Sequence, residues 1–261
     1  PLTGCSLQEA ASIAGAQHVQ LGADLSKVAA MLTPTVPVTR TLTMPKEFRP
    51  FADEWACQPY IEYLRTRPGG FEFNPDYLHW RYGIHYCLRG PFRGRIIFPV
   101  YHKGKLVSYT GRTIWSDAKE RYKSLTTDTN AALAQGLEPA LGPINNYLPW
   151  YDNLITKPAH TLVLCEGPPD ALKVNLIGTP DVVSTCWLGA EPTNAQIELL
   201  HTVSHNFSHK FIFSDEDMPQ KAHRIAWRLH ALGFKAAPLP KDIGDPAEFH
   251  TRDQLLKALN I

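Results

Sequence analysis

The sequence predicts an α/β protein in which a basic α+β N-terminal subdomain precedes a domain with a mainly parallel sheet flanked by helices. Two observations predict this architecture. The last hundred residues alternate between short apolar strands and helices, which is typical of βαβ crossovers. The middle of the chain shows two strand patterns joined by a short turn, which is typical of a hairpin. We therefore expect an N-terminal arm and linker over residues 1–50, the basic subdomain over 51–155, and the parallel-sheet domain with its C-terminal helix over 156–261.

The first 50 residues are expected to form a helical and extended arm. Two short helices are predicted, around Ser6–Ala14 and near Asp24–Leu32. Prolines then recur, and a proline removes a backbone donor and disfavours helix in the residue before it. These prolines are Pro34, Pro37, Pro45 and Pro50. The stretch is therefore predicted to be a linker or an extended arm.

The middle of the chain carries one helix pattern and one hairpin pattern. A short helix is predicted over Gln58–Arg65, because Pro68-Gly69-Gly70 ends it. Strands are predicted over Arg95–Tyr101 and Leu106–Gly111, with a His-Lys-Gly-Lys turn between them. Residues 126–149 are rich in turn formers. We expect a small antiparallel element, followed by a segment with little regular structure.

The last hundred residues are expected to supply the parallel sheet. The helix pattern that ends at Gly233 has apolar residues spaced i, i+3, i+4 and i+7, the spacing of a buried helix face. Because strands and helices alternate, each strand is expected to pair in parallel with a neighbour. The predicted strands are Thr161–Cys165, Asp181–Thr185, Lys210–Ser214 and Phe234–Leu239. The predicted helices are Pro169–Leu176, Thr193–Thr202, Gln220–Leu232 and Pro246–Leu259.

Acidic side chains follow the first and the third of these strands. Glu166 and Asp170 come after the first strand, and Asp215 and Asp217 come after the third. Ligands of parallel α/β sheets bind at the carboxyl ends of the strands, so the four carboxylates are expected at one edge of the sheet. Hard oxygen ligands suit Mg²⁺, together with phosphate oxygens and water. Solvated acidic loops are the simpler explanation of a lone D-x-D motif, but the additional Glu-Gly pair favours a metal site.

Charge is nearly balanced over the whole chain but not along it. The chain has 26 Lys and Arg residues against 25 Asp and Glu residues. Residues 81–125 hold ten of the basic residues and two of the acidic ones, which leaves 16 against 23 elsewhere. A basic stretch beside carboxylates suits polynucleotide chemistry, because cations hold phosphates and carboxylates hold a metal. Tyrosines, Tyr122 among them, lie between the cations and are candidates to stack bases. A solvated basic face with its aromatic rings in the core is the alternative.

Several classes of protein are disfavoured by what the sequence lacks. The five scattered cysteines include no C-x-x-C pair, so neither a disulfide framework nor a complete zinc ribbon is expected. A reducing compartment fits this cysteine usage better. No run of 18 apolar residues occurs, so no transmembrane helix is predicted. The sequence contains neither G-x-S-x-G nor the Walker motif, which leaves serine hydrolases and P-loop enzymes without support.

A resemblance to a known family rests on short motifs in a fixed order. The motifs are Arg95-x-x-Phe98-Pro99, Gly111-Arg112, Arg121-Tyr122-Lys123-Ser124, Glu166-Gly167-x-x-Asp170, Asp215-x-Asp217 and Gly244-Asp245-Pro246. In this order they resemble the RNA-polymerase core of bacterial and phage DnaG-type primases, in which a basic subdomain precedes a TOPRIM domain. Residues from about 58 to 258 follow the family order. The resemblance implies that the parallel-sheet domain is a TOPRIM domain.

The resemblance also implies roles for single residues. Glu166 matches the family's catalytic glutamate, a metal ligand or general acid/base, and Asp215 and Asp217 match its catalytic metal ligands. Asp170 and Asp245 match further acidic positions of the metal site, although Ala247 stands where the family often has another acid. The positions that match the family's nucleotide- and template-binding residues are Arg95, Arg112, Arg121, Tyr122 and Lys123. Either Arg121 or Lys123 fills the family's lysine position.

The activity implied by the resemblance is template-directed synthesis of short RNA primers on single-stranded DNA. The cofactor would be Mg²⁺, with Mn²⁺ as a substitute, and the other ligands would be nucleoside triphosphates and the DNA template. No zinc is expected in this chain, because the family's zinc-binding domain would precede Pro1. A further expected partner is a replicative helicase, which would be fused after Ile261 or recruited as a separate protein. No interaction with a membrane is expected. The expected location is the cytoplasm of a bacterium or of a phage-infected host cell.

Two other classes of function stay open. Another TOPRIM enzyme, a nuclease or a topoisomerase, would use the same carboxylates, but the Arg95-x-x-Phe98-Pro99 module upstream does not fit it. A non-catalytic TOPRIM protein would act as a replication adaptor. The intact Glu166, Asp215 and Asp217 disfavour the adaptor.

Overall fold

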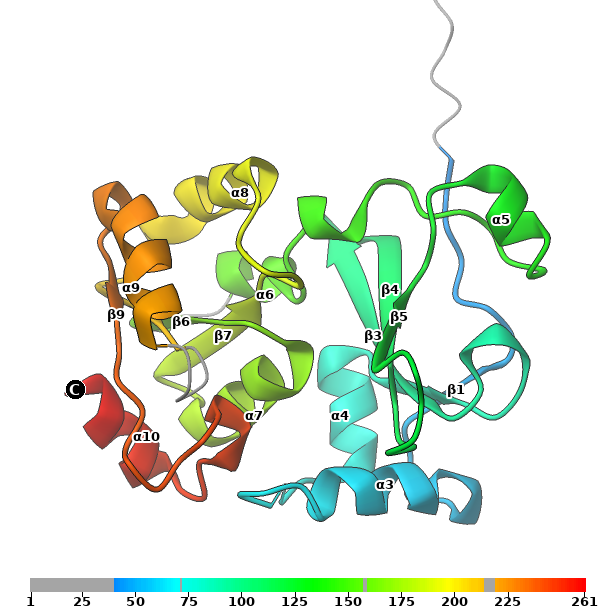
Figure 1. Cartoon of the computed structure of the whole chain (residues 1–261), viewed down its shortest axis with the longest axis horizontal. Helices are drawn as coiled ribbons and strands as arrows, with labels where there is room; N and C mark the ends of the chain where they lie inside the picture. Colours follow the sequence, from blue (N-terminus) through cyan, green and yellow to red (C-terminus); the bar gives the residue numbers. More distant parts are fainter. Residues whose placement is uncertain (1–39, 71, 157–158, 214–218) are drawn as a thin grey trace, which may run out of the picture. The chain divides into compact units, whose positions relative to one another are not determined.

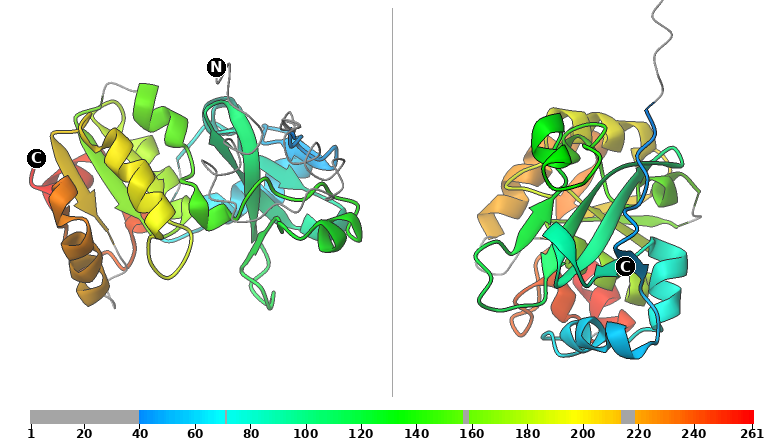
Figure 2. Two further views of the ribbon diagram at one scale, coloured as in Figure 1. Left: turned by 90° about the horizontal axis from the view of Figure 1, so that it is seen from above. Right: turned by 90° about the vertical axis from the view of Figure 1, so that its right-hand side faces the viewer.

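The protein is described here by a computed structural model, which describes residues 40–70, 72–156, 159–213 and 219–261. The chain divides into two units, Pro1–Arg40 and Thr41–Ile261, and the second carries an antiparallel and a parallel sheet (Figures 1 and 2). The helices predicted around Ser6–Ala14 and near Asp24–Leu32 lie outside the described residues. Within the described ranges, no helix has the length and the apolar character needed to span a bilayer.

The antiparallel sheet has five strands, which lie side by side in sequence order. They are β1 (Phe48–Pro50), β2 (His85–Cys87), β3 (Arg95–His102), β4 (Lys105–Thr113) and β5 (Tyr122–Ser124). The predicted hairpin is confirmed as β3 and β4, which are paired from Arg95 opposite Thr113 to His102 opposite Lys105. Strand β1 falls in the stretch predicted to be extended, and it forms an edge of this sheet. An edge position is one where a proline such as Pro50 is tolerated.

The turn of the hairpin is fixed by its own backbone and by helix α6 (Tyr151–Thr156). Lys103 and Gly104 have φ angles of 52° and 75°, the left-handed pair that a two-residue type I′ turn requires. Their N–H groups each donate to the carboxylate of Asp152 at 2.8 Å. The hairpin tip is therefore tied to the segment that leads into the parallel sheet.

Two helices accompany the antiparallel sheet. Helix α3 (Gln58–Arg65) confirms the predicted helix, and α4 (Pro75–Tyr82) was not predicted. The ends of α4 nevertheless carry local signals. The side chain of Asn74 accepts a hydrogen bond from the N–H of Tyr77, a proline occupies the first helical position, and Gly83 ends the helix with φ 68°. The helix follows from these end signals, not from a strong apolar periodicity.

The second sheet is fully parallel among the described strands, with the order β7-β6-β8-β9. The strands are β6 (Thr161–Cys165), β7 (Val182–Cys186), β8 (His209–Ile212) and β9 (Phe234–Ala236). This result confirms the predicted strand–helix alternation and the predicted parallel pairing. The carboxyl end of the inner strand β6 leads directly into Glu166.

Helices cover both faces of the parallel sheet. They are α7 (Pro168–Gly178), α8 (Asn194–Ser204), α9 (Pro219–Arg228) and α10 (Arg252–Leu259). Alternate residues of β6 enter different cores, because successive side chains of a strand point to opposite faces. Leu162 and Leu164 pack with residues of α8 and α9, whereas Val163 and Cys165 pack with residues of α7 and α10. Figure 1 shows the two helix pairs on opposite sides of the sheet.

The prediction of one continuous helix over Pro246–Leu259 is wrong. The structure has a single 3-10 turn, η5 (Pro246–Glu248), and then the separate helix α10. The hydroxyl of Thr251 accepts a hydrogen bond from the N–H of Gln254, and the Gln254 side chain accepts one from the N–H of Thr251. This capping box begins a new helix, so the chain breaks before it.

The antiparallel and parallel halves of Thr41–Ile261 share one hydrophobic core. Leu64 of α3, Leu78 of α4 and Phe98 of β3 belong to the same buried cluster as Leu172 of α7. Burial of this apolar surface is the main favourable contribution to holding the halves together. The site described next lies where the two halves meet.

Candidate active site

A cavity of about 270 Å³ lies between strands β4 and β5 of the antiparallel sheet and the carboxyl end of β6. Both halves of the fold supply its walls. Its lining residues are Thr110, Tyr122, Ser124, Glu166, Gly167, Pro168, Leu188 and Gly189. Three hydroxyl-bearing residues and the carboxylate of Glu166 are thus among the lining residues, beside apolar surface from Pro168 and Leu188. Of the residues predicted from sequence to act in catalysis or binding, Glu166 and Tyr122 line this cavity.

Glu166 is held by a buried lysine. The Nζ atom of Lys221, near the start of α9, donates to Glu166 Oε2 at 2.5 Å. Lys221 is almost completely buried, and its ammonium lies 5.7 Å from the ring centre of Trp187. Among the described residues, Glu166 Oε1 has no hydrogen-bond donor, so one carboxylate oxygen is fixed and the other is available at the cavity. Lys221 is not among the site residues predicted from the sequence, and its position shortly after the D-x-D motif was the available signal.

The turn after Glu166 is tightly packed. Asp170 Oδ2 accepts a hydrogen bond from the N–H of Gly167 at 3.2 Å, at the first turn of α7. A Cβ atom on Gly167 would lie 3.1 Å from that oxygen and 3.4 Å from the hydroxyl of Tyr122. A larger residue at this position would therefore displace the Asp170 carboxylate by a few tenths of an ångström. In the described structure Asp170 shapes the turn that carries Glu166.

Arg112 lies between two tyrosines and fixes one of them at the cavity. Its Nε donates to the hydroxyl of Tyr63 and its Nη1 donates to the hydroxyl of Tyr122, both at 2.6 Å. The guanidinium also lies 5.1 Å from the ring centre of Tyr122. Burial raises the pKa of Tyr122 well above its usual value, so the hydroxyl is protonated at neutral pH and keeps a donor.

Arg95 makes internal contacts. It is buried, and its guanidinium donates to the backbone carbonyls of Gly111, Glu120 and Arg121 at 2.9–3.3 Å. These bonds satisfy one carbonyl of β4 and two carbonyls of the loop that connects β4 to β5. Arg95 was predicted to bind nucleotide or template; in the described structure its contacts organise the sheet that carries Tyr122.

Arg121 and Lys123 point away from the cavity. Tyr122 and Ser124 line the cavity, and side chains alternate along a strand, so the residues between and before them face the other side of the sheet. The ammonium of Lys123 lies 5.3 Å from the ring centre of Phe92 on that side. Arg121 is exposed. The geometry does not single out either of them as the family's lysine.

Asp245 also lies away from the cavity lining. Its Oδ1 accepts a hydrogen bond from the N–H of Ala247 at 2.7 Å and caps η5, and its Oδ2 lies 3.7 Å from Arg67. Burial raises the pKa of Asp245, and the nearby Arg67 opposes that shift. These contacts tie η5 to the loop that follows α3.

Asp215 and Asp217 lie outside the described residues. The described ranges contain no group of three or more His, Cys, Asp or Glu side chains that could hold a metal ion. Among the described carboxylates, Glu166 is the cavity-lining one, with one available oxygen. Its chemistry fits a hard cation such as Mg²⁺, but a full ligand set would need the two aspartates as well.

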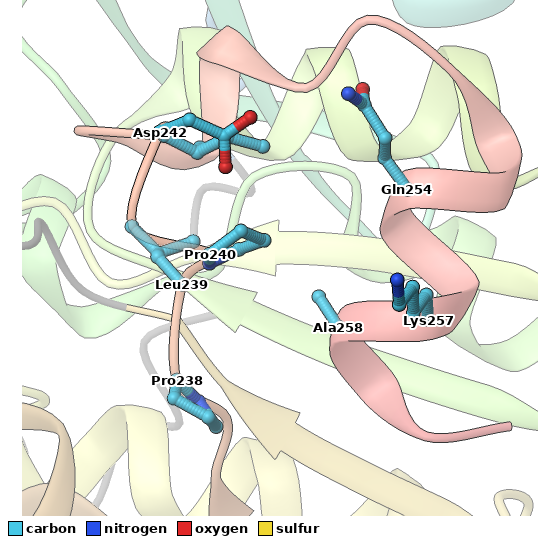
Figure 3. Close-up of a pocket in the computed structure, with 8 residues that line it drawn as sticks. Pro238, Leu239, Pro240, Asp242, Gln254, Lys257 and Ala258 are labelled. Atoms are coloured by element: carbon cyan, nitrogen blue, oxygen red, sulfur yellow. The ribbon is translucent and has the colours of Figure 1, made fainter.

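A second cavity, of about 420 Å³, lies between the segment after β9 and helix α10 (Figure 3). It is lined largely by Pro238, Leu239, Pro240 and Ala258, with Asp242, Gln254 and Lys257 as its polar groups. None of the residues predicted from sequence to act in catalysis or binding lines it. The smaller cavity at Glu166 is therefore the candidate active site.

No protein-family model and no curated protein matches the chain. Solved structures do match. The RNA polymerase domain of Mycobacterium tuberculosis primase DnaG, in complex with a double-stranded DNA oligomer with a 6-nucleotide overhang, is similar with a TM-score of 0.60 and 14% identity over 80% of this chain and 74% of that chain. A DnaG primase catalytic domain bound to single-stranded DNA is similar with a TM-score of 0.54 and 15% identity over 82% and 74%.

A third similar structure is the Aquifex aeolicus primase, comprising zinc-binding and RNA polymerase domains. Its TM-score is 0.52 and its identity is 19%, over 80% of this chain and 56% of that chain. This chain therefore spans little more than half of that structure. Each of these three matches covers 80% or more of this chain. The residues that span one sheet make up a much smaller share of the chain, so each match includes residues of both sheets. The chain has the fold of the DnaG primase catalytic domain.

Proposed function

We propose that this protein is a nucleotidyltransferase of the primase type, which synthesises short RNA primers on single-stranded DNA. One observation carries the proposal. In a fold shared with DnaG catalytic domains, the cavity at Glu166 is walled by hydroxyl-bearing strands of the basic sheet on one side and by a carboxylate at a strand end on the other. With a bound Mg²⁺ between the two anionic groups, this arrangement suits a nucleoside triphosphate whose phosphates approach Glu166.

The exposed cations, which a template can contact, differ from the cations that the sequence motifs predict to bind it. Arg95 donates to carbonyls and Arg112 donates to tyrosines, so both support the site from within. The exposed cations of the basic stretch are Arg89, Arg93, Lys103, Lys105, Lys119 and Arg121. Arg93 lies 5.8 Å from the ring centre of the half-exposed Trp115, a pairing that suits a base stacked beside a phosphate.

In this proposal the metal ligands are Glu166, Asp215 and Asp217. When bound, Mg²⁺ would offset the charge of the triphosphate and activate the attacking hydroxyl. Lys221 holds Glu166 Oε2 and so orients the carboxylate toward the cavity. The hydroxyl of Tyr122 accepts a hydrogen bond from Arg112 and so keeps its proton to donate to a sugar or phosphate oxygen. Ser124 instead donates to Thr110, and Thr110 donates to the carbonyl of Lys123.

The remaining expectations belong to the same proposal. The template is single-stranded DNA, the substrates are nucleoside triphosphates, and a replicative helicase is a further partner. Cytoplasmic location in a bacterium or in a phage-infected cell follows from that activity. Mn²⁺ is proposed to substitute for Mg²⁺, since both accept oxygen ligands.

The proposal is tested by incubating the full chain with single-stranded DNA, labelled ribonucleotides and Mg²⁺ or Mn²⁺. Short RNA products are expected, and Glu166→Gln should abolish them. The matched control is Glu198→Gln, which replaces an exposed carboxylate on α8 with a carboxamide and should keep full activity. Cleaved DNA in place of RNA would support a nuclease or topoisomerase, and the absence of both products would support a replication adaptor.

A further inference from the structure

Helix α9 exposes a tryptophan among cations. Trp227 is 74% exposed, and the ring of His230 lies beside it with its plane within 28° of the indole. Arg224 and Arg228 lie three residues before it and one residue after it on the helix surface. Single exposed apolar residues are common, but Trp227 stands on a helix surface whose neighbouring exposed residues are histidines and arginines.

The cations of α9 form a stripe that starts at the candidate active site. Lys221, Arg224 and Arg228 are spaced i, i+3 and i+7, so they lie along one side of the helix. Lys221 reaches Glu166, and Arg228 is seven residues further on, about 10 Å along the axis at 1.5 Å per residue. The segment 219–232 contains no Asp or Glu. The buried Lys221 marks the end of this side of α9 that lies at the cavity, and Arg224 and Arg228 continue it toward the C-terminal end of the helix.

The two arginines are held in place. Arg224 Nε donates to Glu191 Oε1 at 2.7 Å and Arg228 Nη1 donates to Glu191 Oε2 at 2.9 Å. Each guanidinium has five N–H donors, so these bonds leave donors for a phosphate. A ligand would meet preordered cations, which lowers the entropy cost of binding.

We propose that this face of α9 binds single-stranded DNA that passes the candidate active site. A base stacks on Trp227, and Arg224 and Arg228 hold the neighbouring phosphates. A duplex does not suit the surface, because its base faces are covered. Trp and Arg also occur in protein interfaces, but a protein partner suits this surface less, because His223 and His230 flank Trp227 and no second large apolar side chain among the described residues of the helix extends it into an interface core. The choice of DNA as the ligand rests on the proposed function, in which the template is single-stranded DNA.

The experiment measures the Kd of a fluorescein-labelled dT oligomer for the full chain by anisotropy. Trp227→Ala should raise the Kd about 5- to 150-fold, the range measured for loss of one base-stacking contact, and Trp227→Tyr should recover most of the affinity. The double change Arg224→Gln and Arg228→Gln should lower the slope of log Kd against log salt by about 0.7 per lost phosphate contact. Because Trp227 is largely exposed, none of these changes opens a cavity in the core.

The matched control is Trp55→Ala. Trp55 is 87% exposed but follows Asp53 and Glu54, so it lacks the cations, and its removal should leave the Kd unchanged. An unchanged Kd for Trp227→Ala overturns the proposal, as does an equal loss for Trp55→Ala. Binding of an rU oligomer with no binding of dT overturns it too. Failure of the wild-type chain to make primers contradicts the proposed function instead, since the Kd values are measured without synthesis.

Discussion

Several charged residues that were predicted from the sequence to bind a ligand form hydrogen bonds within the protein instead. Arg95 and Arg112 sit in the basic stretch, yet their donors meet carbonyl and phenol oxygens. Lys221 was not assigned to the site at all, and it contacts the proposed catalytic carboxylate. A buried charge is costly unless it is paired and hydrogen-bonded, so each of these cations has found a partner. Arg112 and Lys221 contact the cavity-lining Tyr122 and Glu166, respectively, so in the proposed function they support the site through these two residues.

The contact between Lys221 and Glu166 leads to a prediction on catalysis. Lys221→Met should leave Glu166 free to rotate and slow primer synthesis by about 100-fold, the cost of a misplaced catalytic group. The loss should appear in kcat more than in KM for nucleotide, and Lys221→Arg should restore part of it. Lys235→Met, which changes an exposed lysine of β9, is the control and should leave both constants unaltered. Wild-type kcat in Lys221→Met would contradict a positioning role.

A second prediction concerns the close packing of Gly167. Gly167→Ala places a methyl group 3.1 Å from Asp170 Oδ2, so the turn must shift and the hydrogen bond at the start of α7 weakens. We expect a loss of about 1 kcal/mol in the free energy of unfolding, measured by urea denaturation. Gly189→Ala is the comparison, because a Cβ atom there meets nothing within 4 Å. Equal stability of the two variants would show that the turn has room to adapt.

At the scale of elements, single polar contacts dock helices onto strands. The hydroxyl of Tyr60, on α3, donates to the carbonyl of Cys87 on β2 at 2.7 Å inside the protein. Thr251 begins α10, and Asn74 begins α4, each through a side-chain oxygen. The sequence predicts α3 and the hairpin β3–β4 well, because periodicity and turn residues are local signals. It did not predict where α10 begins, because the apolar pattern continues across the break.

The docking of α3 leads to a prediction on pH. Burial raises the pKa of Tyr60 from its usual value to about 12. Between pH 10 and 12 the unfolded chain loses this proton and the folded chain keeps it, so Tyr60 makes stability fall as pH rises through that interval. The free energy of unfolding measured at pH 9, 10 and 11 should fall less steeply in Tyr60→Phe than in the wild type. Parallel pH profiles for the two proteins would contradict this assignment.

At the scale of the whole Thr41–Ile261 unit, the halves are joined by a buried lysine as well as by the shared core. Lys173 of α7 donates to the carbonyls of Gly69 and Gly70, in the loop after α3. That loop also lies against η5, where a Cβ atom on Gly69 would come within 2.3 Å of Glu248 Cα. Residues from three separated parts of the chain therefore meet at this junction.

Removal of the Lys173 contact should loosen this junction. Lys173→Met leaves two carbonyls without their donor, and we expect a loss of about 1–3 kcal/mol in the free energy of unfolding. Limited trypsin digestion should cut faster after Arg65, near the released loop. Lys257→Met, which alters an exposed lysine of α10, is the control for both measurements. Unaltered stability together with an unaltered digestion pattern would contradict a role of Lys173 in holding this junction together.

The sequence by itself determined the strand–helix alternation, the parallel pairing, the hairpin and the position of Glu166 at a strand end, because these follow from periodicity and from the rules of βαβ connection. It also led to the fold of the DnaG catalytic domain through the order of its motifs. Only the tertiary structure decided which side chains face the cavity. Lys221 and Glu166 are 55 residues apart, and Arg112 and Tyr63 are 49 apart, so no local pattern carries these contacts. Each contact depends on how elements far apart in the sequence pack within one half, α9 against the end of β6 and α3 against β4, and long-range burial decides that packing.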